Sequence, residues 1–138
     1  MRFGVSVAVL AAVLSFDAAP VRASICLGKS LSLEETVDAI NAEAGCDRAM
    51  KRFEACAYGS SGDIHLGAAV EKKCERNFLD RLKEPQRRLY QSKMRLCDRK
   101  YLNEEGTMYR SLTAFCRAEV ARRFSRQAGS KAAPSSGH

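Results

Sequence analysis

The chain has 138 residues and a formal net charge of +7, and this length is typical of a single domain of ordinary size. It contains six cysteines but only two histidines, and no two cysteines have the C-x-x-C spacing that zinc sites favour. This composition argues against a metal centre, and we expect neither a metal nor a cofactor.

The first 23 residues have the pattern of an export signal. Arg2 supplies the positive start, Val5 to Phe16 form an apolar run, and Val21-Arg22-Ala23 resembles a cleavage site with small residues at its two key positions. The apolar run would rise only about 18 Å as a helix, less than the roughly 30 Å of a hydrocarbon core. We predict that residues 1–23 are a signal peptide, and that the mature chain is periplasmic or secreted without a transmembrane segment.

The mature chain lacks alternating runs of Val, Ile and Thr, so its elements are predicted to be helices. The first helix begins at Ser32, because Ser32 and Glu35 have the spacing of a capping box. Gly45 breaks or kinks this segment, which continues through Met50 and Phe53 towards Cys56. One face of its first part is apolar: Leu33, Val37, Ile40 and Ala44.

A turn is predicted over 58–62, which contains two glycines and two serines. The second helix starts near Asp63, a residue type that commonly caps helix N-termini. Glu84-Pro85 ends this helix or begins the next, since proline fits the first helical turn. Its apolar residues recur at helical spacing: Leu66, Val70, Cys74 and Phe78, with Leu79 and Leu82 beside them.

The third predicted helix runs from about Pro85 to Asn103 and is amphipathic. Leu89 and Leu96 are expected to widen its core-facing stripe, which consists of Tyr90, Met94, Cys97 and Tyr101. A second stripe on the opposite side is basic: Arg88, Arg95 and Arg99.

Gly106 is a suitable helix stop, and Thr107 is a suitable N-cap for a fourth helix. The Ala-, Gly-, Ser- and Pro-rich residues 128–138 are predicted to be a disordered tail. We therefore expect an all-α domain over 24–127, a disulfide-stapled bundle of about four helices in two hairpins. The expected buried residues of the fourth helix are Leu112, Cys116, Val120 and Phe124, with Tyr109 and Phe115 adjacent.

All six cysteines lie in the mature part, and export implies an oxidising compartment, so three disulfides are predicted. Cys97 and Cys116 lie almost symmetrically about Gly106, where an antiparallel hairpin would place them level. Such a bridge closes a loop of about 20 residues and contributes about 3 kcal/mol. Cys46 and Cys74 lie equally far from Ser60 in the predicted turn, so the same reasoning favours the bridge Cys46–Cys74. Cys26 and Cys56 then form the third bridge. The rival set, Cys26–Cys46 with Cys56–Cys74, stays open.

The second half of the chain carries a recognisable motif. Gln86-Arg87-Arg88-Leu89-Tyr90 followed by Cys97 resembles the Q-R-x-W-x(7)-C signature of LprI-like lysozyme-inhibitor domains, which are small domains of the bacterial envelope. Residues 105–108, followed by Cys116 and a basic pair, resemble the G-G-T-x turn, second cysteine and closing helix of that family. The resemblance covers about residues 80–126 and implies an exported helical domain and inhibition of a lysozyme. Its motif residues are Gln86, Arg87, Leu89, Cys97, Gly106, Thr107 and Cys116.

Catalytic patterns are weak in this sequence. A serine or cysteine nucleophile needs a histidine base within the fold, and His65 is the one candidate outside the C-terminal tail. No spacing singles out a pair of carboxylates for glycoside hydrolysis, and no glycine loop cradles a phosphate. We therefore expect a protein that is not an enzyme, with a small envelope hydrolase or its accessory as one alternative.

The charge is unevenly distributed along the chain. Residues 24–80 carry 7 basic and 10 acidic side chains, a net charge of −3, whereas residues 81–126 carry 13 basic and 5 acidic ones, a net charge of +8. Arginine forks suit phosphate and carboxylate groups, so the second half is a candidate anion-binding region for lipid headgroups or cell-wall polymers, and no nucleic acid is expected after export. The candidates are Arg88, Arg95, Arg99, Arg122 and Arg123.

The expected partner is an unidentified protein or envelope component. A basic structural protein that rests on anionic envelope polymers is a further alternative. An acidic stretch in residues 34–54 could instead serve as a docking face, although its simpler interpretation is a solvated helix face. Its carboxylates are Glu34, Glu35, Asp38, Glu43, Asp47 and Glu54.

Overall fold

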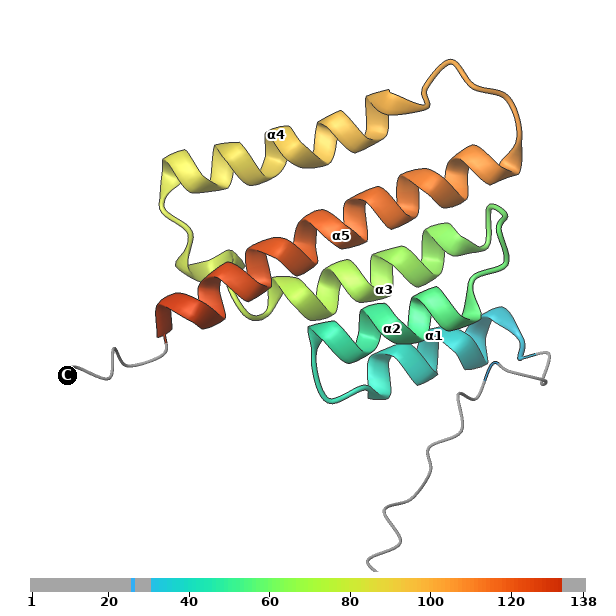
Figure 1. Ribbon diagram of the computed structural model, residues 1–138, viewed down its shortest axis with the longest axis horizontal. Helices are drawn as coiled ribbons and strands as arrows, with labels where there is room; N and C mark the ends of the chain where they lie inside the picture. Colours follow the sequence, from blue (N-terminus) through green and yellow to red (C-terminus); the bar gives the residue numbers. More distant parts are fainter. Residues whose placement is uncertain (1–25, 27–30, 133–138) are drawn as a thin grey trace, which may run out of the picture.

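The computed structural model describes Cys26 and residues 31–132, and all the regular elements in that part are helical (Figure 1). Five α-helices follow one another, and a short 3-10 turn, η1 (Leu79–Arg81), lies between the third and the fourth. The predicted all-α class is confirmed. The predicted signal peptide, residues 1–23, lies outside the described residues. The helices are α1 (Leu33–Ala42), α2 (Cys46–Cys56), α3 (Asp63–Glu75), α4 (Glu84–Lys100) and α5 (Thr107–Ala132).

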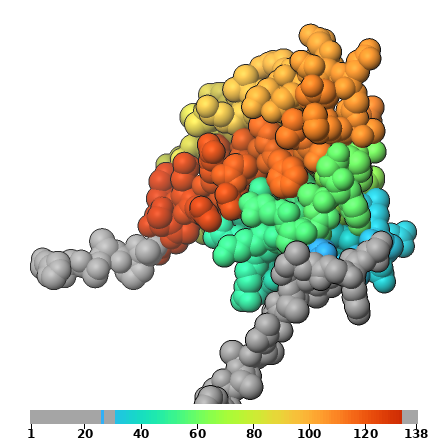
Figure 2. Space-filling model, turned by 45° about the vertical axis from the view of Figure 1, so that its right-hand side comes forward, coloured from blue at the N-terminus to red at the C-terminus, as the bar shows by residue number. Residues whose placement is uncertain are grey.

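The helices are arranged in successive layers. α3 and α5 pack along each other at the centre, α1 and α2 cover α3 on one side, and α4 packs on α5 on the other side (Figure 1). Figure 2 shows α5 crossing between α4 and α2 on one face of the molecule. Within the described residues, none of the helices combines the length and the apolar character needed to cross a membrane.

The first predicted segment forms two helices, so the bundle has five helices instead of about four. α1 begins with the predicted capping box: Ser32 Oγ accepts from the Glu35 amide at 3.2 Å, and Glu35 Oε2 accepts from the Ser32 amide at 2.8 Å. The chain leaves the helix after Ala42, and extended backbone at Glu43 and Gly45 lets α2 turn back along α1. The segment that the sequence predicted to break or kink at Gly45 is therefore interrupted, and Gly45 is the N-cap residue of α2.

The favoured disulfide pairing is confirmed. The Cα–Cα distances are 5.1 Å for Cys26–Cys56, 4.6 Å for Cys46–Cys74 and 5.6 Å for Cys97–Cys116, all within the range of unstrained disulfides. The bridges join the segment before α1 to α2, α2 to α3, and α4 to α5. The outer helices α2 and α4 are therefore each cross-linked to one helix of the central pair, α2 to α3 and α4 to α5.

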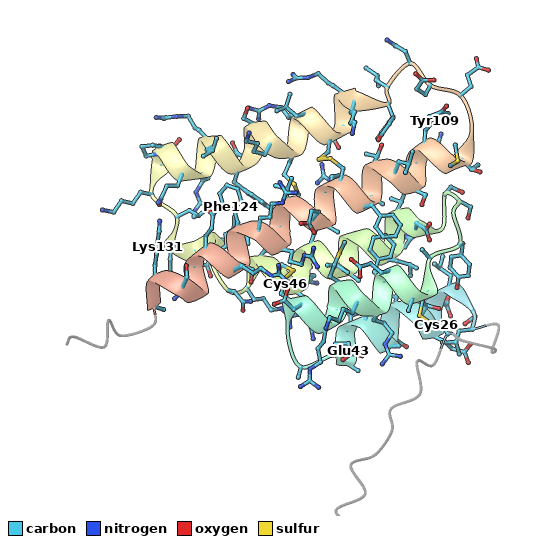
Figure 3. All side chains as sticks on the ribbon, in the orientation of Figure 1. Cys26, Glu43, Cys46, Tyr109, Phe124 and Lys131 are labelled. Atoms are coloured by element: carbon cyan, nitrogen blue, oxygen red, sulfur yellow. A yellow bond between two sulfur atoms is a disulfide. The ribbon has the colours of Figure 1, made fainter. Side chains whose placement is uncertain are left out.

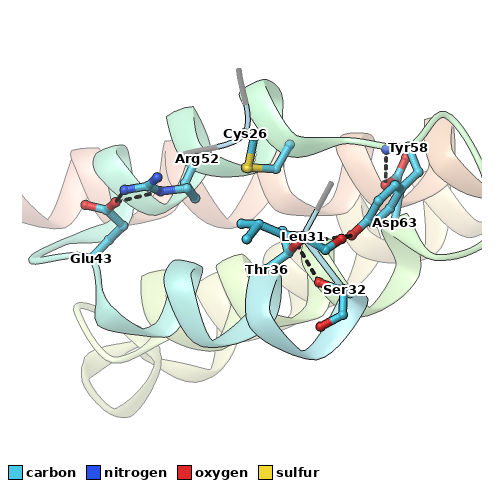
Figure 4. The surroundings of a disulfide bond; sticks show 9 residues. Cys26, Leu31, Ser32, Thr36, Glu43, Arg52, Tyr58 and Asp63 are labelled. Atoms are coloured by element: carbon cyan, nitrogen blue, oxygen red, sulfur yellow. Dashed lines mark hydrogen bonds and ion pairs between the residues drawn. A yellow bond between two sulfur atoms is a disulfide. The ribbon is translucent and has the colours of Figure 1, made fainter. Parts of the chain in front are cut away.

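The sequence predicted Asp63 as the N-cap of α3. In the structure Asp63 is instead the first helical residue of α3. Its carboxylate is fully buried and accepts from the amides of Tyr58 (2.8 Å) and Gly59 (2.9 Å) and from Ser111 Oγ on α5 (2.6 Å). Figure 4 shows the contact of Asp63 with Tyr58, and it also shows Thr36, whose hydroxyl lies 3.1 Å from Tyr58 Oη. The buried carboxylate thus ties the predicted 58–62 turn to the central helix.

α5 differs most from its predicted burial. Its most buried residues are small, and Leu112, expected in the core, is 37% exposed. The reason is the close approach of α3, because a Cβ added to Gly67 would lie 3.0 Å from the Cβ of Ala114. Larger side chains are displaced to the flanks of this contact, where Phe115 stacks on Phe53. The buried stripe consists of Ser111, Ala114, Ala118, Ala121 and Ser125.

Two further predicted boundaries need correction. The second predicted helix ends at Glu75 instead of running towards Leu82, and the chain turns so that Phe78 enters a cluster with Tyr90 and Phe124. The predicted tail is helical through Ala132, because Ala128 still packs against the core; residues 133–138 lie outside the described residues.

Candidate functional site

The expected core stripe of α4 is only partly correct. Tyr90, Met94 and Cys97 are buried, but Leu89 and Leu96 are 51% and 50% exposed. α4 packs chiefly on α5, so one row of side chains is enough to fill that single interface. The two leucines lie beyond its edge, and the prediction that they widen the core stripe is wrong.

The five candidate arginines fall into two groups. On α5, Arg122 and Arg123 both pair with Glu119, at 2.6 Å and 3.1 Å, and Arg122 also lies 3.9 Å from a carboxylate oxygen of Glu54 on α2. On α4, Arg88 pairs with Glu84 one turn earlier at 3.2 Å. The structure therefore neutralises these three arginines within the molecule.

Arg95 and Arg99 belong to a different environment. Together with Lys93 and Lys100 they are exposed on the second half of α4, and none of the four side chains forms an ion pair or hydrogen bond with another residue of the described part. Lys100 lies 5.1 Å from the ring centroid of Tyr101. We call Lys93, Arg95, Arg99 and Lys100 the α4 cation patch.

Asp98, the one carboxylate within the patch segment, is engaged elsewhere, and Glu104 and Glu105 in the loop after α4 form no ion pair with the patch cations. Asp98 accepts from Arg117 Nη1 on α5 at 2.8 Å, and the same guanidinium bonds both carboxylate oxygens of Glu71 at 2.9 Å and 3.0 Å. Burial raises the pKa of Glu71, while its hydrogen bond with Arg117 is the largest cause that raises the pKa of Arg117. This pair of acidic contacts holds α3, α4 and α5 together and leaves the patch uncompensated.

Part of the patch has a structural explanation. Arg99 and Lys100 lie in the last turn of α4, where cations favourably oppose the negative end of the helix dipole. This effect fades within one turn, so it does not explain Lys93 and Arg95. The patch as a whole is thus more basic than helix stability requires.

A groove follows the seam between α4 and α5 on the side of the exposed leucines. One hollow of about 450 Å³ lies over the Cys97–Cys116 disulfide, with Leu96 and Val120 as apolar walls and three patch cations around it. A second hollow of about 490 Å³ lies at the other end of the seam, where Leu89 faces Phe124. Cationic and apolar surfaces therefore alternate along one face of α4.

The residues that carry the resemblance to LprI-like domains mainly shape the backbone. Gln86 Oε1 accepts from the Lys83 amide at 3.2 Å, and Arg87 Nη2 donates to the Leu79 carbonyl at 3.0 Å. Gly106 has a φ of +114°, which favours glycine, and α5 begins at Thr107, so Thr107 is its first residue and not its N-cap. Gln86 and Leu89 are both exposed and also line the second hollow.

Part of the acidic stretch of 34–54 is paired with arginines of the protein itself. Glu43 accepts from Arg52 at 2.8 Å, and Asp47 accepts from Arg126 on α5 at 2.8 Å. Glu35 bonds the Ser32 amide, which lowers the pKa of its carboxyl group. Glu43 and Asp47 are thus paired, whereas Glu34, Glu35 and Asp38 on α1 keep their negative charge without a cationic partner among residues 31–132.

Catalytic groups are not gathered at this face. His65 is exposed near the start of α3, and in residues 26 and 31–132 no three His, Cys, Asp or Glu side chains cluster closely enough to hold a metal ion. All six cysteines are in disulfides. What the face offers a ligand is positive charge and apolar surface.

Comparison with known proteins found no matching family model, no matching curated protein and no matching solved structure. Function is therefore inferred from the geometry of the α4 face. The sequence pattern identified Arg95 and Arg99 but not the roles of Lys93, Lys100 and the two leucines. Helical angles could have separated these leucines from the core stripe, because they lie to one side of Tyr90 and Cys97.

Proposed function

We propose that this chain is an exported, non-catalytic binding domain that holds an anionic component of the bacterial envelope against α4. The observation that carries the proposal is the α4 cation patch, four exposed cations within eight residues that have no carboxylate partner in residues 31–132. Several other arginines of the second half pair with acidic side chains, among them Arg117, Arg122 and Arg123. A cluster left without partners is suited to an external anion.

The strength of such a contact is sufficient for reversible binding. Each lysine or arginine near an anionic surface contributes about 1 kcal/mol, so four together contribute about 4 kcal/mol, or roughly a thousandfold in affinity. Exposed charges are screened beyond about 10 Å at 0.1 M salt, so the affinity should fall as the ionic strength rises. Arg95 and Arg99 add planar forks that can bond two phosphate oxygens at once.

The setting of the proposal is the oxidising side of the cytoplasmic membrane. Three disulfides are compatible with that compartment, and the motif shared with LprI-like domains supports an envelope role. The net charge of +8 over residues 81–126 favours an anionic ligand over a basic one such as a lysozyme. We therefore place binding of an envelope anion ahead of lysozyme inhibition.

An experiment that neutralises the patch cations tests this proposal. The disulfide-intact protein is titrated with vesicles of phosphatidylglycerol in phosphatidylcholine, and Lys93, Arg95, Arg99 and Lys100 are all changed to Gln. The control changes four exposed cations on α2 and at the end of α3, so that both variants have the same net charge: Arg48, Lys51, Lys72 and Arg76.

We expect the patch variant to lose at least about a hundredfold in vesicle affinity, allowing for incomplete contact of some cations, and the control to lose less than about threefold. Thermal unfolding of both variants checks that the fold is intact. Equal losses in the two variants would show that net charge alone drives binding, and that result would refute a specific site on α4.

A further inference from the structure

The second hollow of the α4–α5 groove has a chemical character of its own. It lies where η1, the first turns of α4 and the last turns of α5 meet, and its volume of about 490 Å³ falls within the usual range of ligand sites. We call it the aromatic pocket. In Figure 3, Phe124 lies between α4 and α5 and Lys131 lies at the end of α5, on the same side of the molecule.

The floor of the aromatic pocket is rigid and apolar. Phe78 is only 2% exposed, and its ring lies 5.1 Å from Tyr90 and 5.7 Å from Phe124 between centroids. Tyr90 and Phe124 in turn make an edge contact at 5.0 Å. Because these three rings hold one another in place, the floor is formed before any ligand arrives. Leu82, Leu89 and Ala128 extend the apolar lining.

The rim of the aromatic pocket is cationic and carries no acid. Arg81 and Lys131 are exposed at its edge, Gln86 and Gln127 add side-chain amides, and no Asp or Glu lines it. The Arg81 guanidinium donates to the Asn77 carbonyl, which steadies it while its other N–H groups stay available. An anionic head can therefore sit at the rim without meeting a negative charge.

An apolar interior below a cationic, acid-free rim is complementary to a molecule with an alkyl chain and a negative head. We infer that the aromatic pocket binds the acyl chain of an anionic lipid, with the lipid's charged head between Arg81 and Lys131. The inference deepens the proposed function and rests on it in one respect. It makes the envelope anion an amphiphile, whereas the α4 cation patch alone would accept any polyanion.

The test uses dodecyl phosphate, below its micelle concentration, as the probe in calorimetric titrations of the disulfide-intact protein. Ala128→Trp fills the aromatic pocket, and Ala68→Trp is the matched control, because Ala68 lines a different hollow of about 410 Å³ between α3 and α5. A double variant, Arg81→Gln with Lys131→Gln, removes the charge at the rim. Inorganic phosphate and dodecyl maltoside separate the head from the chain.

We expect one dodecyl phosphate per chain, with Ala128→Trp weakening binding at least about tenfold, the cost of losing contact with about two methylene groups. Ala68→Trp should bind like the unchanged protein, and the rim variant should bind about tenfold more weakly. Inorganic phosphate binding as tightly as dodecyl phosphate would overturn the inference, and so would equal effects of the two tryptophan variants.

Two other occupants of the pocket are distinguished by the same set of proteins. If a second copy of the chain filled it, the unchanged protein would sediment as a dimer and Ala128→Trp as a monomer, which would refute the lipid assignment. If residues 133–138 filled it, ending the chain after Ala132 would raise the affinity for dodecyl phosphate several-fold. That result would show that these residues, and not a lipid, occupy the pocket in the intact chain. We expect the unchanged protein to sediment as a monomer, and truncation after Ala132 to leave the affinity for dodecyl phosphate unchanged.

The outcome also separates this inference from the proposed function. If Ala128→Trp binds dodecyl phosphate normally while the patch variant fails to bind vesicles, the aromatic pocket has no lipid role and the α4 cation patch stands. If Ala128→Trp loses dodecyl phosphate while the patch variant binds vesicles normally, the pocket stands and the proposed role of the patch fails.

Discussion

The three N-terminal helices and α4 differ in what their polar side chains hold together. In α1 to α3 the buried Asp63 has three hydrogen-bond donors, and Glu43 and Asp47 are paired with arginines, Asp47 with one on α5. In α4 the cations of the patch have no such partner among the described residues, and Leu89 and Leu96 are half exposed.

The same two regions differ in how they are held. α1 to α3 pack against one another and α5 and are linked by two disulfides, whereas α4 packs chiefly on α5 and has one disulfide and the Arg117 contacts. An α-helix that is supported on one side only keeps a wide surface for contact with other molecules. The difference suggests a braced scaffold that presents α4.

The largest effect should come from an aspartate in the braced region. Asp63→Ala leaves the amides of Tyr58 and Gly59 and the Ser111 hydroxyl without their buried acceptor, so we expect a loss of about 3–5 kcal/mol in the free energy of unfolding. Asp98→Ala on α4 removes a half-exposed partner of Arg117 and should cost less than about 1 kcal/mol. Urea unfolding with the disulfides intact measures both. Similar losses in the two variants would contradict the comparison.

A smaller and more local effect is expected from the disulfide that holds α4. Replacing Cys97 and Cys116 by serine should cost about 3 kcal/mol and should mainly release α4, because that helix has few other contacts. Replacing Cys46 and Cys74 instead should lower protection throughout α1 to α3. Amide hydrogen exchange distinguishes the two outcomes. If the first variant loses protection equally in α4 and α3, then α4 is not the separately held element described above.

The local features of this fold could be predicted from the sequence. The spacing of Ser32 and Glu35 indicated the start of α1, and the symmetry of Cys97 and Cys116 about Gly106 indicated their bridge. Both depend on residues that are close in the chain or are related by one turn. Hairpin geometry converts such spacing directly into contacts.

Features that depend on the packing of distant segments were not predicted. The small-residue stripe of α5 depends on how closely α3 approaches at Gly67, and the pairing of Arg126 with Asp47 joins residues far apart in the sequence. Periodicity identified Leu89 as apolar but could not show that no second helix covers it. The basic stripe was recognised, whereas its division into paired and free cations needed the structure.

The smallest expected effect concerns how the first helices of the two regions begin. α1 has both halves of a capping box, whereas at the start of α4 Gln86 accepts from the Lys83 amide but Lys83 has no side-chain oxygen to return the bond. Ser32→Ala should therefore cost about 1 kcal/mol, and Gln86→Ala should cost less. Thermal unfolding of the two variants gives the comparison.

The capping box also has a pH dependence whose sign follows from Glu35. Hydrogen bonds with Ser32 lower the pKa of Glu35 below its ordinary value, the bond with the Ser32 backbone having the larger effect and the bond with its side chain the smaller one. The folded state therefore favours the ionised form. The stabilisation is therefore complete above pH values near the unfolded pKa and is lost as the pH falls through the lowered folded pKa. The stability difference between the unchanged protein and Glu35→Gln should be constant near neutral pH and should shrink in acid. Glu34→Gln removes an equal charge from the same turn without breaking the box, so an acid-sensitive difference of the same size there would show that general helix-dipole effects, and not the capping box, fix the start of α1.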